Sequence, residues 1–250
     1  MPDVVIPFLA LPGLGLLIIV AFVAGVVRGF SGFGTAMIYL PVAGGILSPF
    51  EALTTLVCMD LVGPVPNLRR AIRDGTPDDI LRLSIGLVIA LPLGVWALSL
   101  VAPQVFRYGV SIITFVLLVL LISGFRYRRS LTPAMVTATG GLGGFLAGSV
   151  GLPGPPVIMV YMGAALPVSA IRANITLFLF MGDIAMLVVL WVFGHLVPSA
   201  IGLGLVLMIP NLLGNIAGAR LFRPRAERNY RVIAYSIIAF SAVSGLPLWD

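Results

Sequence analysis

An arginine set among glycines and hydroxyls is the first place in this chain where chemistry could occur. The stretch Gly25–Thr35 reads Gly-Val-Val-Arg-Gly-Phe-Ser-Gly-Phe-Gly-Thr and lies inside an apolar run over about residues 11–47. Glycine inside a helix costs about 1 kcal/mol relative to alanine, and a charge at bilayer depth costs at least about 2.5–3.5 kcal/mol. We therefore predict a broken helix whose freed N–H groups face a ligand. The alternative is that the glycines only permit close helix packing.

The predicted break near residues 29–34 offers donors for an anion. Arg28 supplies a positive charge, and the tip adds backbone N–H groups and hydroxyls from Gly29, Ser31, Gly32, Gly34 and Thr35. A second, proline-rich break over residues 148–156 offers Gly148, Ser149, Gly151 and Gly154. Half-helices that begin at Thr35 and Pro155 would direct the positive ends of their dipoles to the tips, which favours an anionic ligand. For Arg28 the alternative is a side chain that snorkels to the membrane interface.

Three further charged residues are candidates for function. Arg172 follows the second break and is either a ligand contact or an interfacial residue on the cytoplasmic side. Asp60 and Asp183 lie inside apolar segments of the two halves. Intramembrane carboxylates are functional candidates by default, as proton carriers or ion-pair partners. The alternative for both is a static salt bridge, for example with Arg28.

The composition places these residues in a polytopic α-helical membrane protein. The 250 residues are 60% hydrophobic and only 10% charged, a balance that cannot cover a water-soluble surface. The basic residues are all arginines in short loops, so the net charge of +6 indicates membrane topology and not nucleic-acid binding. The single cysteine, Cys58, excludes an internal disulfide and a cysteine-based metal cluster. We expect no cofactor and no metal.

Glycine and proline divide the chain into eight apolar segments. The first, about 11–47, and the fifth, about 133–166, are too long for one crossing, and each contains one of the two breaks. The other six each fit a single crossing, over about residues 50–68, 80–101, 108–124, 170–193, 199–221 and 229–247.

The two halves of the chain repeat. Matching glycines recur at constant spacing, first Gly25, Gly29 and Gly32 and then Gly144, Gly148 and Gly151. Arginine clusters at 69–73, 126–129 and 220–231 all face the cytoplasm only if each broken segment enters and returns on one side. We therefore predict an inverted-topology repeat of residues 1–129 and 130–250. Each half has one broken re-entrant hairpin plus three transmembrane helices, a plan of secondary transporters.

The two hairpins also resemble a known family. The first, Ala24–Thr35 followed by Pro41, resembles the opening of the sulfite exporter TauE/SafE family of membrane permeases, and Gly144–Gly151 is similar to its second-half repeat. The resemblance covers nearly the whole chain. It implies secondary transport of a small anion such as sulfite, sulfoacetate or a related organosulfonate across the bacterial cytoplasmic membrane. The second tip carries Leu152–Pro156 where the first has Phe33–Met37, so the two tips are chemically unequal.

Two other classes of function, a channel and an enzyme, fit the sequence to different extents. A passive anion channel of the same architecture is the alternative to a carrier. An intramembrane enzyme is disfavoured, because the chain has no His-Glu-x-x-His motif and no Gly-x-Gly-Asp motif. The expected partners are a small anionic substrate and membrane lipid, not nucleic acid. The sequence leaves both a monomer and a homodimer open.

Overall fold

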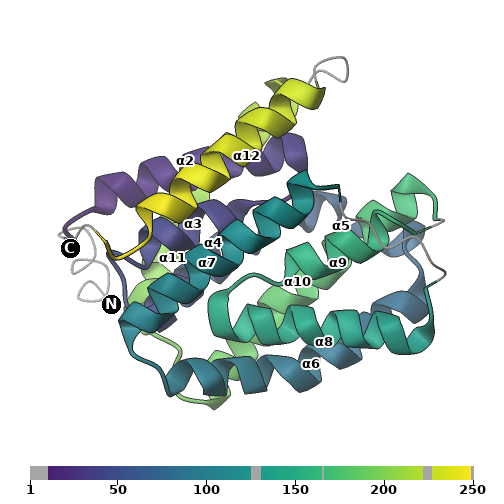
Figure 1. Cartoon of the computed structure of the whole chain (residues 1–250), viewed down its shortest axis with the longest axis horizontal. Helices are drawn as coiled ribbons and strands as arrows, with labels where there is room; N and C mark the ends of the chain where they lie inside the picture. Colours follow the sequence, from purple (N-terminus) through teal and green to yellow (C-terminus); the bar gives the residue numbers. More distant parts are fainter. Residues whose placement is uncertain (1–10, 125–130, 165, 222–226, 249–250) are drawn as a thin grey trace. The chain divides into compact units, whose positions relative to one another are not determined.

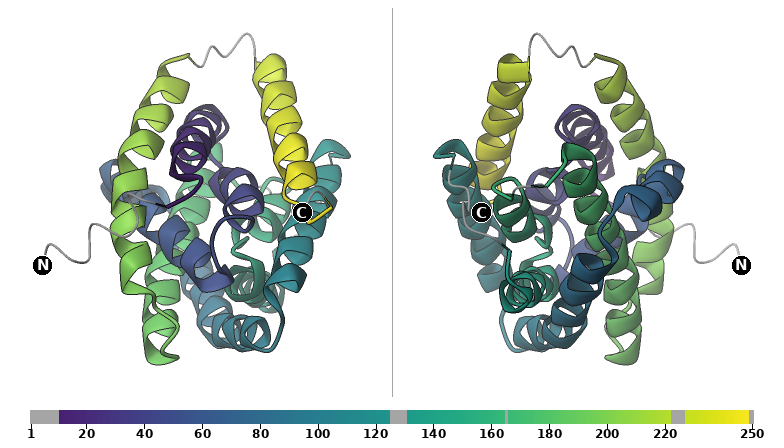
Figure 2. Two further views of the ribbon diagram at one scale, coloured as in Figure 1. Left: turned by 90° about the vertical axis from the view of Figure 1, so that its left-hand side faces the viewer. Right: turned by 90° about the vertical axis from the view of Figure 1, so that its right-hand side faces the viewer.

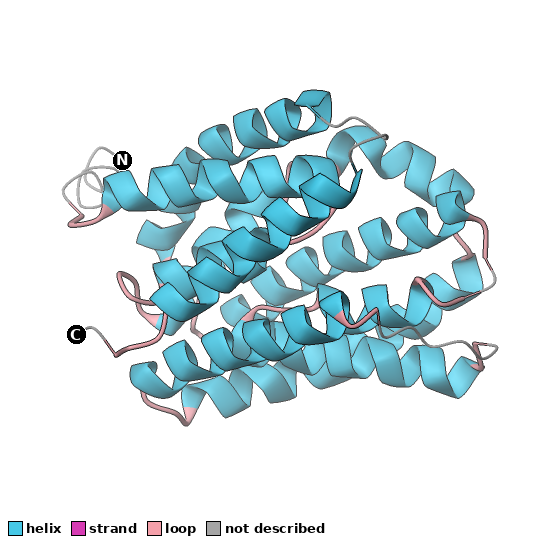
Figure 3. Cartoon of the chain, turned by 45° about the horizontal axis from the view of Figure 1, so that its top comes forward, coloured by secondary structure: helices cyan, strands magenta, loops and turns pink. Residues whose placement is uncertain are grey.

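The computed structural model describes residues 11–124, 131–164, 166–221 and 227–248, and all regular structure in these ranges is helical (Figure 3). The helices are α2 (Leu14–Ser31), α3 (Thr35–Ala43), α4 (Pro49–Asp60), α5 (Val65–Asp74), α6 (Pro77–Ser99), α7 (Pro103–Ile122), α8 (Pro133–Val150), α9 (Gly154–Tyr161), α10 (Val168–Val192), α11 (Pro198–Leu221) and α12 (Glu227–Ser244). The predicted all-α class is confirmed for the described part of the chain.

Five of the described helices are long and apolar enough to cross a membrane. They are α2, α6, α7, α10 and α11, with mean hydropathies from 1.8 to 2.4. Four of the six segments predicted to cross once thus have a matching helix, namely α6, α7, α10 and α11. Among the described residues, the apolar part of α12 covers Val232–Ser244, and the predicted eighth crossing stays a prediction.

Both predicted breaks are confirmed. Helix α2 ends and α3 begins around Gly32 and Gly34, whose φ angles are 82° and 106°. Helix α8 ends at Gly151, with φ 72°. Residues with a side chain rarely adopt this left-handed conformation, which explains why glycine occupies these positions at the helix ends.

The second segment is not the single crossing predicted over 50–68. Its helix stops at Asp60, and α5 begins at Val65 after a turn over residues 61–64. Proline has no N–H to donate and fits best in the first turn of a helix, so Pro64 and Pro66 start a new helix and cannot continue α4. The prediction of one continuous helix here was wrong.

The helices form two compact units. The first unit covers residues 1–63, 102–118 and 194–250, and holds α2, α3, α4, most of α7, α11 and α12. The second covers 64–101 and 119–193, and holds α5, α6, α8, α9 and α10. Each unit draws helices from both halves of the sequence, and the division into repeats at residues 129 and 130 stays a prediction.

In the first unit, α2 packs along α11 through glycines. A Cβ atom on Gly25 would lie 2.1 Å from the Asn211 carbonyl oxygen, and one on Gly218 would lie 2.1 Å from the Val26 carbonyl oxygen. Figure 2 shows α2 between α11 and α12, and α2 contacts both of these helices. Only residues without a side chain allow two backbones to approach this closely.

The second unit uses the same device between α6 and α8. These helices lie side by side along much of their length (Figure 1). A Cβ atom on Gly86 would lie 2.1 Å from the Thr137 carbonyl oxygen, and one on Gly148 would lie 2.4 Å from that of Leu91. The glycines at these two contacts therefore permit close helix packing, and ligand binding by the glycines at the tips stays a prediction.

We expect Gly25→Ala to lower the free energy of unfolding by about 1–3 kcal/mol, because its methyl group overpacks against the α11 backbone. Gly15→Ala is the matched control in the same helix, since nothing lies within 4 Å of a Cβ atom there. This control should leave stability unchanged or raise it. Thermal unfolding of the purified protein in detergent measures both, and equal midpoints for the two variants would contradict the packing account.

Candidate functional site

The first unit brings Arg28 to a partly buried ion pair. Arg28 lies in the last turn of α2, and its Nη1 contacts Oδ2 of Asp60, the last residue of α4. The two side chains are 12% and 16% exposed. The Arg28 Nη1 atom also lies 3.5 Å from Thr35 Oγ1, at the start of α3. We call Arg28, Thr35, Asp60 and Gly63 the hairpin-tip site.

The hairpin-tip site lies where two helix breaks meet. Gly63 belongs to the turn that follows α4, and its N–H donates to the Asp60 carbonyl oxygen at 3.2 Å. A Cβ atom on Gly63 would lie 3.7 Å from Cζ of Arg28. The guanidinium group therefore lies against the turn after α4 as well as against the tip between α2 and α3.

A buried hydrogen bond fixes α3 relative to α4. The Tyr39 hydroxyl, one turn after Thr35, donates to Thr55 Oγ1 at 2.9 Å, and both residues are buried. The Thr55 hydroxyl in turn donates to the Glu51 carbonyl oxygen at 2.9 Å. These bonds hold the start of α3, and with it Thr35, at a defined place beside Asp60.

The electrostatics of the site make Asp60 dependent on Arg28. A carboxylate at the C-terminal end of a helix is disfavoured by the dipole of that helix, whereas an arginine there is favoured. The Asp60 Oδ1 atom is buried and has no hydrogen-bond partner among the described residues. Arg28 is thus the ion-pair partner of the Asp60 carboxylate.

The two tips differ in their donors. The first N–H groups of α3 have no partner within the helix, and the first regular bond there runs from Ile38 to the Gly34 carbonyl oxygen. In α9 the corresponding positions hold Pro155 and Pro156, which have no N–H. The unequal chemistry predicted from the sequence therefore corresponds to a donor-rich first tip and a donor-poor second tip.

Several of the predicted tip residues have structural partners. The Ser31 hydroxyl donates to the Val27 carbonyl oxygen at 2.6 Å, and the Ser149 hydroxyl donates to that of Phe145 at 2.7 Å. Gly29 and Gly148 lie inside helices, and a Cβ atom on Gly29 would lie 2.2 Å from the Asn215 carbonyl oxygen. Their contact with a ligand stays a prediction.

The remaining predicted glycines shape the turns. Gly32, Gly34 and Gly151 adopt left-handed conformations at the helix ends. Gly154 opens α9 and is buried, and a Cβ atom there would lie 3.4 Å from a methyl carbon of Leu179. These positions set the path of the backbone, and ligand binding by their N–H groups stays a prediction.

The comparison with protein families gives a match over nearly the whole chain. The model of the family described as Sulfite exporter TauE/SafE matches residues 17–245. The chain belongs to the TauE/SafE family. Membership and the five apolar helices together identify a multi-pass membrane protein of a transporter family. Comparisons with curated proteins and with solved structures found no match.

In this TauE/SafE protein, Arg172 and Asp183 both lie on α10 in the second unit. Arg172 lines a pocket between α5 and α10, whereas Asp183 is not among the residues that line it. Asp60 forms an ion pair with Arg28, and its role in proton coupling stays a prediction. The Arg28 guanidinium group contacts Asp60, and whether Arg28 lies at the membrane interface stays a prediction.

Sequence reasoning missed the part of the site formed by the turn after α4. The residues 61–64 were expected inside a continuous helix, so Gly63 was not a candidate. The sequence signal for this turn is Gly63-Pro64-Val65-Pro66, in which a glycine is followed by prolines on both sides of Val65.

We expect Asp60→Leu to lower the free energy of unfolding by about 3–5 kcal/mol, because it leaves the buried Arg28 charge unpaired. Adding Arg28→Met should restore most of this loss, since two apolar side chains can replace a buried pair. Asp78→Leu, at an exposed carboxylate in the first turn of α6, is the control and should cost less than about 1 kcal/mol. Additive losses in the Arg28→Met/Asp60→Leu protein would contradict the pairing.

Proposed function

We propose that this protein is a secondary transporter that carries a small sulfur-containing or carboxylated organic anion across the cytoplasmic membrane by alternating access. Sulfite, sulfoacetate or a related organosulfonate is the expected cargo, on the basis of the family. The observation that carries the proposal is the partly buried ion pair of Arg28 with Asp60 beside two helix breaks. Charged side chains inside a membrane protein are functional candidates by default because they are costly to place there.

In this proposal the substrate competes with Asp60 for Arg28. A sulfite or sulfonate oxygen takes the place of the Asp60 carboxylate at the guanidinium group, which binds planar or tetrahedral oxyanions with two parallel hydrogen bonds. The Thr35 hydroxyl and the free N–H groups of α3 supply further donors at the same tip. Binding of the anion breaks the ion pair. If Asp60 becomes neutral at the same time, the net charge of the site does not change.

Asp60 becomes neutral by taking up a proton. Its Oδ1 atom is buried without a partner among the described residues, so it is the position at which a proton would be held. Asp183 is the second candidate for this coupling, on α10. An inside-negative potential already favours export of a singly charged anion by about 2.3 kcal/mol per 100 mV. Proton uptake by a carboxylate therefore matters most for transport into the cell.

The internal packing of the units supports the inverted repeat. In each unit one broken hairpin packs through glycines on one long helix, α2 on α11 in the first and α8 on α6 in the second. The hairpin and the long helix of each pair come from opposite halves of the sequence. We propose that both hairpins are re-entrant and that motion of the repeats about them gives alternating access.

We expect flux of radiolabelled sulfite, methanesulfonate or acetate in proteoliposomes to saturate for at least one anion and to show counterflow. The Arg28→Met/Asp60→Leu protein, which should remain folded, should reduce this flux at least tenfold because the guanidinium is missing. Arg69→Gln, at an exposed arginine of α5, is the control and should retain it. Flux without counterflow would indicate a channel, and unchanged flux in the double variant would overturn the site.

Methanesulfonate separates substrate titration from protein titration, because it keeps one negative charge throughout the working pH range. We expect its flux to rise as pH falls, since protonation of Asp60 releases Arg28. Asp60→Asn should remove this pH dependence. If Asp60→Asn and Asp183→Asn both leave the pH dependence intact, carboxylate coupling is wrong.

A further inference from the structure

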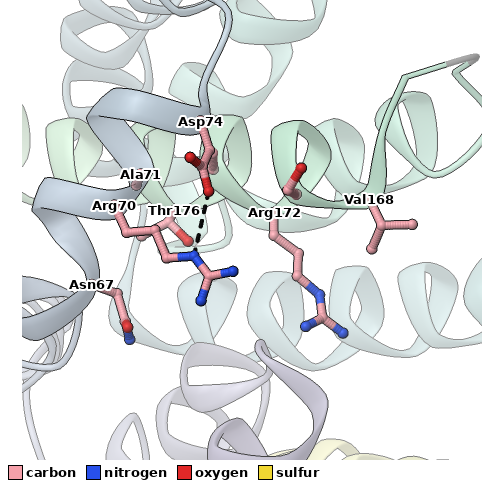
Figure 4. Close-up of a pocket in the computed structure, with 9 residues that line it drawn as sticks. Asn67, Arg70, Ala71, Asp74, Val168, Arg172 and Thr176 are labelled. Atoms are coloured by element: carbon pink, nitrogen blue, oxygen red, sulfur yellow. Dashed lines mark hydrogen bonds and ion pairs between the residues drawn. The ribbon is translucent and has the colours of Figure 1, made fainter.

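The second unit contains a pocket with an excess of positive charge. The pocket lies between α5 and α10 and has a volume of about 380 Å³. Two arginines contribute to its lining, Arg70 from α5 and Arg172 from α10. Figure 4 shows both side chains extending to the same side of the pocket from their separate helices.

The two arginines differ in their partners. Arg70 Nε lies 3.3 Å from Asp74 Oδ2, and Arg73 Nε lies 3.0 Å from Asp74 Oδ1. The Arg73 and Arg70 guanidiniums hold the pKa of Asp74 below its ordinary value, so this carboxylate is charged at neutral pH. Arg172 has no ion pair and no hydrogen bond with any residue in the described ranges of the chain. The pocket therefore holds one guanidinium that is shared with a carboxylate and one that is not.

Neutral donors lie beside these charges. Asn67 and Thr176 also line the pocket, and their side chains have no hydrogen bond to other described residues. An amide and a hydroxyl can each donate to an oxyanion. The lining thus combines two planar cationic donors with two neutral ones, which suits a small anion with several oxygens.

Buried contacts connect α10 to α5 and to the turn that follows α5. The Asn174 side chain accepts from the Thr76 N–H at 2.9 Å and donates to Thr76 Oγ1 at 2.6 Å, and Asn174 is fully buried. Ala71, Ala173 and Leu177 form a buried cluster between the two helices. These contacts hold α5 and the turn before α6 against α10, so the backbone positions of Arg70 and Arg172 are fixed relative to each other.

We infer that the pocket between α5 and α10 binds a tetrahedral oxyanion, held by the guanidinium groups of Arg70 and Arg172, with Asp74 competing for Arg70. A sulfate or sulfonate in solution and the phosphate of an anionic lipid headgroup share this chemistry. The inference rests on the pocket alone and does not require that the hairpin-tip site transports an anion.

The test uses the full chain in phosphatidylcholine nanodiscs, with radiolabelled inorganic sulfate as the probe. Arg172→Gln and Arg70→Gln should each weaken sulfate binding at least tenfold, because each removes one guanidinium. Asp74→Asn should tighten binding several-fold, because it removes the competing carboxylate. Arg69→Gln is the matched control, an exposed arginine of α5 outside the pocket lining, and should change affinity less than twofold.

The opposite directions of these effects separate a binding site from a structural one. Loss of folding could weaken binding in Arg172→Gln, but it cannot tighten binding in Asp74→Asn. The Arg70 side chain is 74% exposed, so Arg70→Gln should fold normally. Sulfate affinity that is unchanged in both arginine variants, or weakened in Asp74→Asn, would overturn the inference.

A second set of nanodiscs containing phosphatidylglycerol identifies the source of the anion. If the lipid headgroup occupies the pocket, this lipid should weaken sulfate binding in the wild type through Arg172, and Arg172→Gln should remove the effect. If the ligand is a free anion, the lipid should have no such effect. Sulfate bound at the hairpin-tip site is distinguishable because it is sensitive to Arg28→Gln and not to Arg172→Gln. Absence of transport would therefore not contradict the oxyanion site between α5 and α10, and absence of sulfate binding there would not contradict transport.

Discussion

The cost of holding a charge inside an apolar protein is the constraint on which the rest of this structure depends. Arg28 and Asp60 are mostly buried, and each would be strongly destabilising alone. The fold meets this cost by ending α2, starting α3 and ending α4 at one place, so that the guanidinium lies against a carboxylate, a hydroxyl and a glycine turn. A pair of this kind contributes little net stability to the fold. In the proposed function, the Arg28 guanidinium group is the cation that binds the anion.

Glycine has two separate roles in the broken helices, one at close contacts inside the helices and one at the helix ends. Gly25 and Gly148 lie within helices, where they let α2 approach α11 and α8 approach α6 closely. Gly32 and Gly151 lie at helix ends, where they adopt left-handed conformations that end α2 and α8. The first helix of each broken segment is thus packed closely against a long helix through the glycines inside it.

The sequence predicted the helical class, both hairpin breaks and four of the crossings, because apolar length and glycine or proline identity encode these features locally. It did not predict the turn after α4, because the apolar pattern continues across Gly63 and Pro64. The contact between Arg28 and Asp60 depends on how α2 and α4 pack, which the sequence alone does not give. The Ser31 hydroxyl could equally have faced a ligand, and its hydrogen bond to the Val27 carbonyl oxygen depends on local geometry that no spacing rule fixes.

The central claim is that a bound anion replaces Asp60 at Arg28 and that Asp60 then takes up a proton. Infrared difference spectroscopy of the protein in lipid, recorded on addition of methanesulfonate, observes this carboxyl group directly. The account predicts loss of a carboxylate band and gain of a protonated carboxyl band, both absent in Asp60→Asn and both present in Asp183→Asn. Saturable binding of methanesulfonate without any change in the Asp60 bands would contradict it.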